Sequence, residues 1–297
     1  MFDRRRPLAL ALACAVAVLA GCGGPDEAVA SHANRSARQD WQTMSLSRRA
    51  AGEERLAVEL EYGAGKLTVA PGSSDQLYQA RMRYDASAFE PVTSYSDGRL
   101  QIGVEGGQIR GRKLEAGSLD LQLSPDVALD LELAFGAAEA DIELGGLRIE
   151  SLELSTGASR TSLAFSEPNP IAANTLTLQV GAAQLTAKGL ANANARQISV
   201  EGGVGDIELD FTGTLSNDID VSVEMGLGRL VLRIPRGVGV RIDKDGLLAA
   251  VKGEGLVQRG DVYYSAEYDS AERRLHFDID AAFNAIDIVW VDNNPAG

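Results

Sequence analysis

The hydrophobic pattern of this chain is dominated by a motif in which two alternating segments flank a glycine. In the copy centred on Gly226, counted as position zero, apolar residues occupy −5, −3 and −1 and return at +4, +6 and +8: Val221, Val223, Met225, Leu230, Leu232 and Ile234. Alternation with a period of two predicts a strand with one buried face. Because the parity changes between −1 and +4, a straight strand would expose half of this set. The motif therefore predicts two strand arms joined by a corner, for which glycine is a suitable backbone residue.

The motif recurs with a nearly constant period. Its central glycines are Gly63, Gly136, Gly157, Gly181, Gly203 and Gly226. From Gly136 onward they are 21, 24, 22 and 23 residues apart, and a further copy without glycine is centred on Ala282. A fixed period of roughly 20–50 residues is typical of stacked repeat architectures. We therefore predict an all-β fold, a single-chain β-solenoid (β-helix-like) of about 22-residue coils in parallel register, with these glycines as structural turn residues.

Departures from the repeat divide the chain into five parts. Residues 1–21 are predicted as a signal peptide, 22–52 as a flexible tether, 53–126 as an N-terminal β capping region, 127–242 as the regular coils, and 243–297 as a C-terminal β hairpin and capping coil. The tether lacks periodicity and is rich in alanine, serine and arginine. Caps are expected because an open strand edge invites aggregation. The copy that lacks glycine is expected to be the terminal coil.

The N-terminus resembles a bacterial lipoprotein signal. Arg4, Arg5 and Arg6 precede an apolar run over residues 8–20, which is shorter than the roughly 20 residues that a transmembrane helix needs. The run ends in Leu-Ala-Gly followed by Cys22, which resembles the lipobox. The resemblance implies fatty acyl chains such as palmitate on Cys22, a mature chain that begins there, and a lipid anchor in a membrane. Gly23 at the next position favours the outer membrane if the cell is Gram-negative. The alternative is an ordinary signal peptide with a chance cysteine.

Charge and cysteine content exclude several classes of partner and site. The formal net charge is −14, and removal of residues 1–21, with three arginines and one aspartate, takes it to −16. A chain this acidic is repelled by nucleic acid, so we expect no nucleic-acid partner. Cys14 lies inside the signal, so the mature chain has no spare thiol. Disulfides, thiolate catalysis and cysteine metal sites are thereby excluded.

Few residues offer catalytic or metal-binding chemistry, and we predict no catalytic residues and no cofactor. His32 lies in the tether and His276 at an outward position, without a second histidine in reach. Position −2 carries Glu201, Glu224 and Asp280, whose carboxylates would stack on neighbouring coils. A Ca²⁺ ion would relieve their repulsion, so these three are weak metal candidates. The alternative is a solvated acidic face.

Aromatic residues are scarce outside the expected core. Those outside it gather at Tyr263, Tyr264 and Tyr268. They form either a binding patch or ordinary strand packing.

Several segments resemble a known family. Residues 62–69, 77–84 and 165–170 resemble the bacterial toast-rack β-repeat family, and the glycine pattern is shared with "putative adhesin" repeats of bacterial surface proteins. Residues 226–240 are similar to the C-terminal domain of Lia-type cell-envelope stress regulators. The resemblance covers roughly residues 54–292. It implies a β-helix-like fold and brings no established catalytic residues. The chain departs from the stress regulators because it has a lipid-anchor signal where they have transmembrane helices.

These observations together predict a non-enzymatic, lipid-anchored protein of the bacterial cell envelope. It would present a binding or adhesion surface to an envelope protein or a surface polymer. Two alternatives remain, a modulator of an envelope-stress sensor and a carbohydrate-active β-helix enzyme with carboxylates on one coil face.

Overall fold

The protein folds as an all-β unit, which confirms that part of the prediction. The structure is a computed structural model and describes residues 39–106, 117–245 and 250–293. Among these residues the one helical element is a single 3₁₀ turn, η1 (Leu190–Ala193). No helix there has the length and apolar character needed to cross a membrane. The predicted signal peptide, the lipidation site Cys22 and His32 lie outside the described residues.

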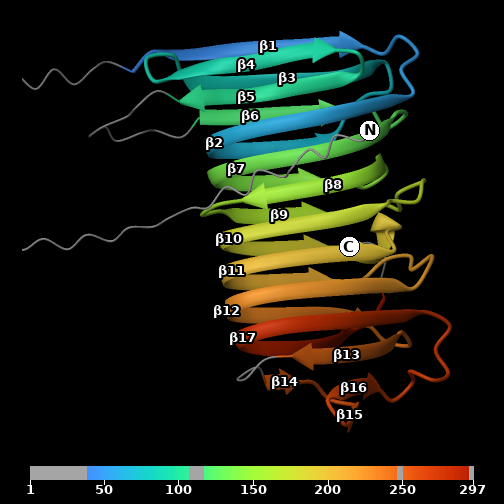
Figure 1. The fold of residues 1–297 in the computed structure, drawn as a ribbon. Helices are drawn as coiled ribbons and strands as arrows, with labels where there is room; N and C mark the ends of the chain where they lie inside the picture. Colours follow the sequence, from blue (N-terminus) through green and yellow to red (C-terminus); the bar gives the residue numbers. More distant parts are fainter. Residues whose placement is uncertain (1–38, 107–116, 246–249, 294–297) are drawn as a thin grey trace, which may run out of the picture. The chain divides into compact units, whose positions relative to one another are not determined.

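All strands belong to one sheet that winds through the unit (Figure 1). Six strands come before the regular repeat: β1 (Trp41–Arg49), β2 (Arg55–Pro71), β3 (Gln76–Asp85), β4 (Phe89–Ser96), β5 (Arg99–Gly106) and β6 (Gly117–Leu123). The next six carry it: β7 (Ala128–Glu143), β8 (Arg148–Thr156), β9 (Arg160–Ala164), β10 (Thr175–Lys188), β11 (Gln197–Asp210) and β12 (Ile219–Pro235). The last five are β13 (Gly239–Asp245), β14 (Ala250–Lys252), β15 (Leu256–Arg259), β16 (Val262–Ser265) and β17 (Arg274–Val291).

Each copy of the motif forms one coil with two arms. In β2, β7, β10, β11, β12 and β17 both arms belong to one bent strand, whereas β8 and β9 are the two arms of the copy centred on Gly157. Successive copies pair in parallel and in register, so that Val200 faces Leu178 on one side and Val223 on the other. Residues at the same position of the motif therefore form columns that run across the strands.

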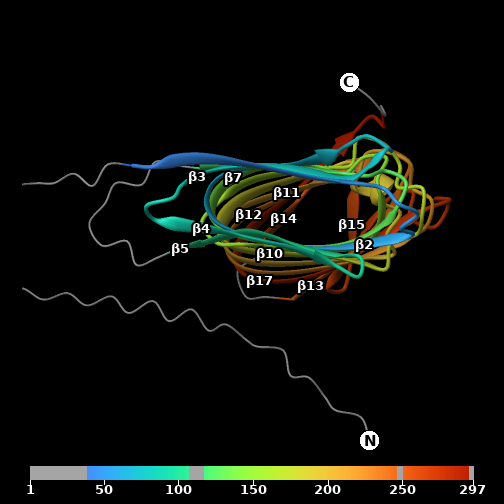
Figure 2. The same cartoon turned by 90° about the horizontal axis from the view of Figure 1, so that it is seen from above.

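The core lies between the two arms of every coil. Seen along the stack, the arms enclose an elongated interior, with the bends at one side and the closing segments at the other (Figure 2). The positions predicted to be buried are buried: Val223 and Leu232 are 0% exposed, and Leu230 is 1% exposed. Burial of one leucine side chain stabilises the folded state by about 1.5–3 kcal/mol. Apolar columns of this kind run from β2 to β17 and form one core cluster.

The glycines at position zero mark the corner, but the reason differs from the expected one. A φ in the left-handed region occurs two residues later, at Gly65, Gly205 and Gly228. From Gly136 to Gly226, an added Cβ at each position-zero glycine would lie 2.5–3.0 Å from the carbonyl oxygen of the position-zero glycine on the preceding coil. The glycine column therefore permits close approach of backbone to backbone between coils.

Buried asparagines hold the segments that close the coils. Asn169 is 3% exposed, and its Nδ2 donates to the carbonyl oxygens of Ile149 (2.8 Å) and Ala193 (3.1 Å). Asn192 donates to the carbonyl oxygen of Phe165 (2.9 Å) and accepts from the backbone N–H of Thr214 (2.8 Å). Asn192 thus links its own coil to both neighbouring coils, and Asn169 links its closing segment to β8 of the same coil and to the next coil, where strand pairing is interrupted.

The N-terminal strands cover the open edge of β2. The first arm of β2 pairs with β5, and its second arm pairs with β6. On their other edges, β5 pairs antiparallel with β4, and β6 pairs antiparallel with β3. β1 pairs with β3 from Trp41 to Arg49, which makes the prediction of a flexible tether wrong for this segment. Met44 and Leu46 pack against the core and Arg83 stacks on Trp41 at 3.8 Å. Six of the nine residues of β1 are exposed and none is buried, so the strand has little apolar alternation in the sequence.

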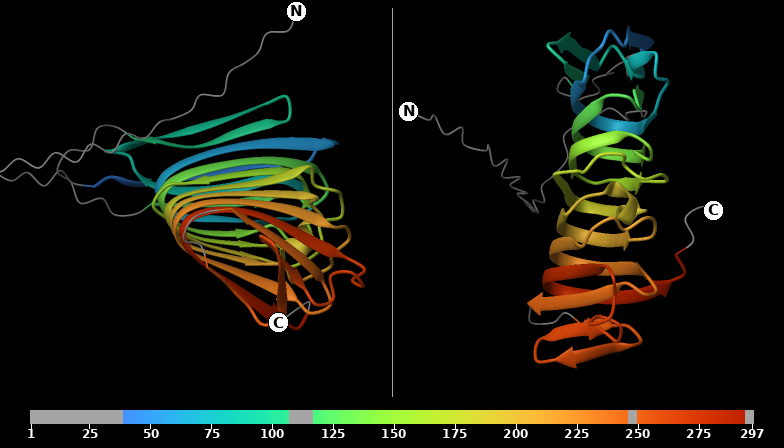
Figure 3. Two further views of the ribbon diagram at one scale, coloured as in Figure 1. Left: turned by 60° about the horizontal axis from the view of Figure 1, so that its bottom comes forward. Right: turned by 90° about the vertical axis from the view of Figure 1, so that its right-hand side faces the viewer.

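The C-terminal coil occupies an unexpected place in the stack (Figure 3). β17 pairs in parallel with β12 on one edge and with β13 and β14 on the other. The copy centred on Ala282 is therefore an interior coil, not the terminal one that its missing glycines suggested. β13 and β14 form the outer layer, and β16 and β15 extend it by antiparallel pairing. In sequence order, the strands of the end layer, β13 to β16, therefore precede β17, the coil on which that layer lies.

A pair of glycine substitutions separates the corner's crowded and open positions. In Gly228→Ala the new Cβ would overlap the carbonyl oxygen of Gly205, at a φ of +143° that alanine rarely adopts. We expect a loss of at least about 2 kcal/mol in the free energy of unfolding. Gly63→Ala meets no atom within 4 Å and should change stability by less than about 1 kcal/mol. Chemical denaturation measures both, and equal effects would contradict the crowding of the corner at Gly228.

Candidate functional site

The stack presents two outward faces of different chemistry. The first-arm face consists of the residues at −6, −4 and −2 on the first arms, from β5 through β2, β7, β8, β10, β11, β12 and β17 to β13. The second-arm face consists of the residues at +3, +5 and +7 on the second arms, from β6 to β14. Strand pairing brings each position into a straight column on its face.

The first-arm face is strongly acidic. In the described coils it carries twelve carboxylates and two arginines: Glu59, Glu61, Asp130, Glu132, Glu153, Glu201, Asp220, Glu224, Asp243, Asp245, Asp278 and Asp280, with Arg99 and Arg241. The acidic residues lie towards the two ends of the face. Between them are short neutral side chains: Ser151, Ser155, Thr175, Thr177, Ser199 and Ser222.

The second-arm face has nearly balanced charge. Eight carboxylates (Asp120, Glu139, Asp141, Glu143, Asp206, Glu208, Asp210 and Asp287) lie among six basic residues (Lys66, Arg160, Lys188, Arg229, Arg233 and Lys252). Several of these pair across coils, as Arg229 does with Asp287 at 2.8 Å and Arg233 with Asp210 at 3.3 Å. The second-arm face shows that ion pairs across coils fit this fold. The excess of acidic residues on the first-arm face is therefore a property of the sequence and not a requirement of the fold.

The predicted acidic ladder is present as a column of neighbours. Glu201 pairs with Glu224, Glu224 with Asp280, and Asp280 with Asp245 of β13. Coils in parallel pairing are about 4.8 Å apart. The exposed carboxylates form a straight row on the outer surface, and over the described ranges no group of three or more acidic, histidine or cysteine side chains converges as a metal site requires. The ladder's binding of Ca²⁺ stays a prediction.

A second ladder at position −4 shows the electrostatic cost of this arrangement. Glu132 lies between Glu59 and Glu153 on neighbouring coils. Partial burial, followed by repulsion from Glu153 and Glu59, raises the pKa of Glu132 above its ordinary value. Arg99 offsets part of this and pairs with Glu59 at 3.6 Å. Like charges on adjacent strands therefore oppose folding here.

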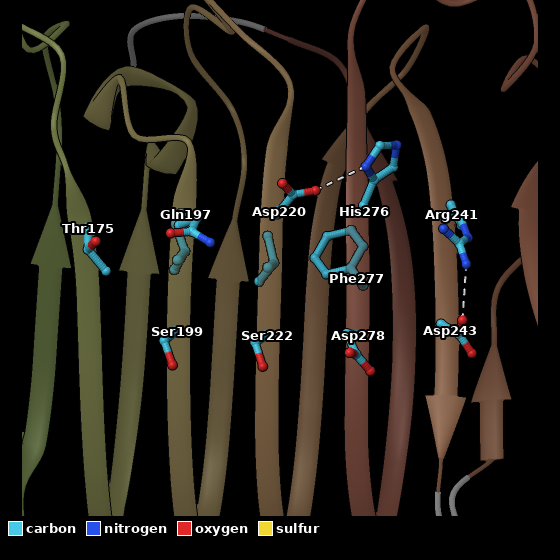
Figure 4. A pocket seen from close by; sticks show the side chains of 12 residues that line it. Thr175, Gln197, Ser199, Asp220, Ser222, Arg241, Asp243, His276, Phe277 and Asp278 are labelled. Carbon is cyan, nitrogen blue, oxygen red and sulfur yellow. Dashed lines mark hydrogen bonds and ion pairs between the residues drawn. The ribbon is translucent and has the colours of Figure 1, made fainter.

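A groove of about 490 Å³ crosses the strands of the first-arm face near its C-terminal end. Figure 4 shows two rows of side chains that line it. One row contains Thr175, Gln197, Asp220, His276 and Arg241, and the other contains Ser199, Ser222, Asp278 and Asp243. The groove lies over short hydroxyl side chains and ends among charged ones.

A hydrogen-bonded chain of three side chains adjoins this groove. Nδ1 of His276 lies 3.1 Å from Oδ1 of Asp220, and its Nε2 lies 3.2 Å from the hydroxyl of Tyr268. The ring of Tyr268 packs edge-on against that of Tyr264, with the ring centroids 5.1 Å apart. Asp220 is 56 residues from His276 in the sequence, yet both occupy position −6 of their copies. Only the insertion of β17 beside β12 brings them together, which is why the sequence did not reveal the pair.

A second groove, of about 350 Å³, continues along the same face towards β5. It is lined by Arg99, Asp130, Glu132 and Glu153 among others, and Thr175 lines both grooves. Asp130 is held by an ion pair with Arg55 at 2.7 Å and accepts a hydrogen bond from Ser151 at 2.7 Å. The two grooves form one polar track across the stacked strands, hydroxyl-rich at its centre and acidic at both ends.

Glu132→Gln is expected to stabilise the protein at neutral pH but not in acid. Its raised pKa means that folding favours the protonated form. The penalty is absent below the ordinary value of 4.5 and is present once the pH exceeds the folded-state value. Because the side chain is only partly buried and solvent screens its repulsion, the gain should stay below about 1 kcal/mol. Urea denaturation near neutral pH and near pH 3.5 measures it.

The matched control for this change is Glu139→Gln on the second-arm face. Glu139 faces Arg160 on the next coil, so its neutralisation should not stabilise the protein. A gain from Glu132→Gln that persists in acid would contradict the repulsion between the glutamates.

Comparison with known proteins supports the resemblance in the sequence. Residues 31–186 match the family model described as the N-terminal domain of toast_rack, DUF2154. A search of the curated proteins finds no match. Residues 226–240, with their similarity to Lia-type regulators, lie beyond the matched segment, and that similarity stays a prediction.

The chain also matches solved structures of bacterial proteins at low sequence identity. A "putative cell adhesion protein" from Clostridium sporogenes is 15% identical, with a TM-score of 0.42 over 85% of this chain and 100% of its own. A "putative adhesin" from Bacteroides fragilis is 12% identical, with a TM-score of 0.40 over 84% of this chain and 97% of its own. A "putative lipid binding protein" from Parabacteroides distasonis is 12% identical, with a TM-score of 0.35 over 85% and 97%. The family match spans more than half of the 297 residues, so the chain belongs to the toast-rack family.

Proposed function

We propose that this protein is a lipid-anchored β-solenoid of the bacterial cell envelope that binds a partner through its first-arm face and carries out no catalysis. The observation that carries the proposal is the segregation of charge. Twelve carboxylates and two arginines lie on one face, whereas the other has eight carboxylates and six basic residues.

The excess of acid on the first-arm face has a cost that the fold does not impose. Like charges on neighbouring strands destabilise a sheet. The second-arm face avoids this by placing Arg229 and Arg233 beside acidic residues. Features that oppose stability without a structural need are typical of functional sites. A partner with complementary charge would relieve the repulsion on binding.

The repeat also makes the face suitable for an extended partner. In-register pairing of β10, β11, β12 and β17 repeats the same outward positions about every 4.8 Å. In a solenoid each coil contacts only its neighbours, so a long, regular surface arises from few distinct contacts.

The contacts of His276 favour binding over catalysis. Both of its ring nitrogens are engaged, one by Asp220 and the other by Tyr268. A general base in a nucleophilic site needs one nitrogen directed at a nucleophile. Within the described residues, neither partner of His276 is a serine or threonine.

Lipidation at Cys22 is tested by fractionation. Cys22→Ala should move the protein from the membrane fraction to the soluble fraction after a wash with about 1 M salt, which screens binding through the acidic face. Cys14→Ala, inside the signal segment, is the control and should stay in the membrane fraction. If Cys22→Ala also remains in washed membranes, the proposed anchor is wrong.

The binding face is tested with isolated envelopes. We expect the Glu201→Gln/Glu224→Gln chain to bind envelopes at least about fivefold more weakly than the unaltered chain at low salt. The control Asp141→Asn/Asp206→Asn removes two carboxylates from the second-arm face and should bind normally. A cosedimentation assay on the detergent-solubilised chains measures this. Equal loss in both variants would show that net charge, rather than the first-arm face, governs binding.

A further inference from the structure

We propose that the groove on the first-arm face is a glycan-binding site that takes a polysaccharide segment containing amino sugars. The inference rests on the proposed binding function and names its ligand class. The glycan would lie across the strands, over Ser199 and Ser222, with its ammonium groups near Asp220 and Asp278. These four residues line the same groove of about 490 Å³.

The chemistry of the groove centre favours a hydroxyl-rich ligand. Serine and threonine hydroxyls from β10, β11 and β12 line it, and Gln197 adds an amide. A hydroxyl both donates and accepts hydrogen bonds, and an amide offers both functions too. Sugar hydroxyls have the same dual character, so each rung of the stack can contact one sugar hydroxyl in either direction. A ladder with one short polar side chain per coil suits a polymer with regularly spaced hydroxyls.

The strand pairing argues against an extended peptide in the same place. A peptide that binds a sheet gains most of its affinity from the backbone groups of an unpaired edge. β11, β12 and β17 are paired along both edges throughout the groove, so no such edge is available. The part of the groove lined by outward side chains contains no large apolar side chain. Phe277, which also lines it, is 2% exposed and belongs to the core.

The charge of the groove selects among glycans. Asp220, Asp243 and Asp278 line it against Arg241 alone, and Arg241 donates to Asp243 at 3.1 Å. Uronic-acid or phosphate-bearing polymers would be repelled by this charge. An ammonium group would be attracted to Asp278, for which the described residues provide no ion-pair partner. Asp220 is 72% exposed and remains accessible while it bonds to His276.

The hydrogen-bonded chain at the end of the groove holds one of these acids in place. His276 bonds to Asp220 on the groove side and to Tyr268 on the other. Tyr268 in turn packs against Tyr264, and the side chain of Arg274 donates to the backbone carbonyl of Tyr268 at 3.2 Å. The carboxylate of Asp220 is thereby oriented before a ligand arrives, which lowers the entropic cost of binding.

Calorimetric titration of the detergent-solubilised full chain tests the inference with four probes. These are a glucosamine oligomer, the matching N-acetylglucosamine oligomer, polygalacturonate and poly-lysine. We expect the glucosamine oligomer to bind, its N-acetylated counterpart to bind about tenfold more weakly because it lacks the ammonium groups, and polygalacturonate not to bind.

Variants locate the binding within the molecule. Asp278→Asn should weaken binding of the glucosamine oligomer about fivefold, and Ser199→Val/Ser222→Val should weaken it about tenfold through the loss of two hydrogen bonds. Valine is well tolerated in strands, so the fold should be kept, and unchanged thermal midpoints would verify this. Asp141→Asn on the second-arm face is the matched control and should bind like the unaltered chain.

The outcomes separate this inference from the proposed function. Equal binding of the two oligomers, or equal effects of Asp278→Asn and Asp141→Asn, would overturn the amino-sugar assignment. Binding of poly-lysine without the glucosamine oligomer would overturn the glycan inference in favour of a basic polypeptide, while a binding role for the face would stand. If no probe binds but the envelope assay still separates the first-arm variant from its second-arm control, the glycan inference is wrong and the proposed function stands. If envelopes do not discriminate either, both fail.

Discussion

Parallel, in-register pairing between coils is the constraint on which the rest of this structure depends. Because each coil copies the positions of its neighbour, one residue type at one position of the motif becomes a column across the sheet. Apolar columns produce the core, and the glycine column permits the close approach of backbones at the corner. The same constraint applies to polar positions, where it places like charges beside like charges unless the sequence alternates them. Stability and surface chemistry are thus set by the same register.

Where the sequence predicted structure well, it did so because the register acts at every copy. The buried set at −5, −3, −1, +4, +6 and +8 could be identified from one copy and checked in the others, and Val223, Leu230 and Leu232 are buried as expected. The location of the corner glycines followed in the same way. Their physical role did not, because the contact that excludes a side chain at Gly203 comes from Gly181 on another coil. A single copy contains no trace of that contact.

The parts that the sequence missed lie where the register ends or is reordered. β1 has one paired edge and is largely exposed, so its apolar positions Met44 and Leu46 do not stand out from their polar neighbours. The order of the last coils was missed for a different reason. Distance along the chain predicts that neighbouring copies are adjacent, but β13 and β14 leave a place for β17 beside β12. The pairing of Asp220 with His276 depends on that choice.

The groove depends on the same reordering. In the groove, β17 lies between β12 and β13, although both of these strands precede it in the sequence. β17 contributes His276 and Asp278 to the lining. β12 contributes Asp220 and Ser222, and β13 contributes Arg241 and Asp243. Without β17, the side chains of β12 and β13 would have no strand to join them into one groove. β17 therefore joins the regular coils to the end layer and completes the polar track. This one strand supplies both the pairings that join the end layer to the regular coils and side chains at the end of the groove, so the groove requires β17.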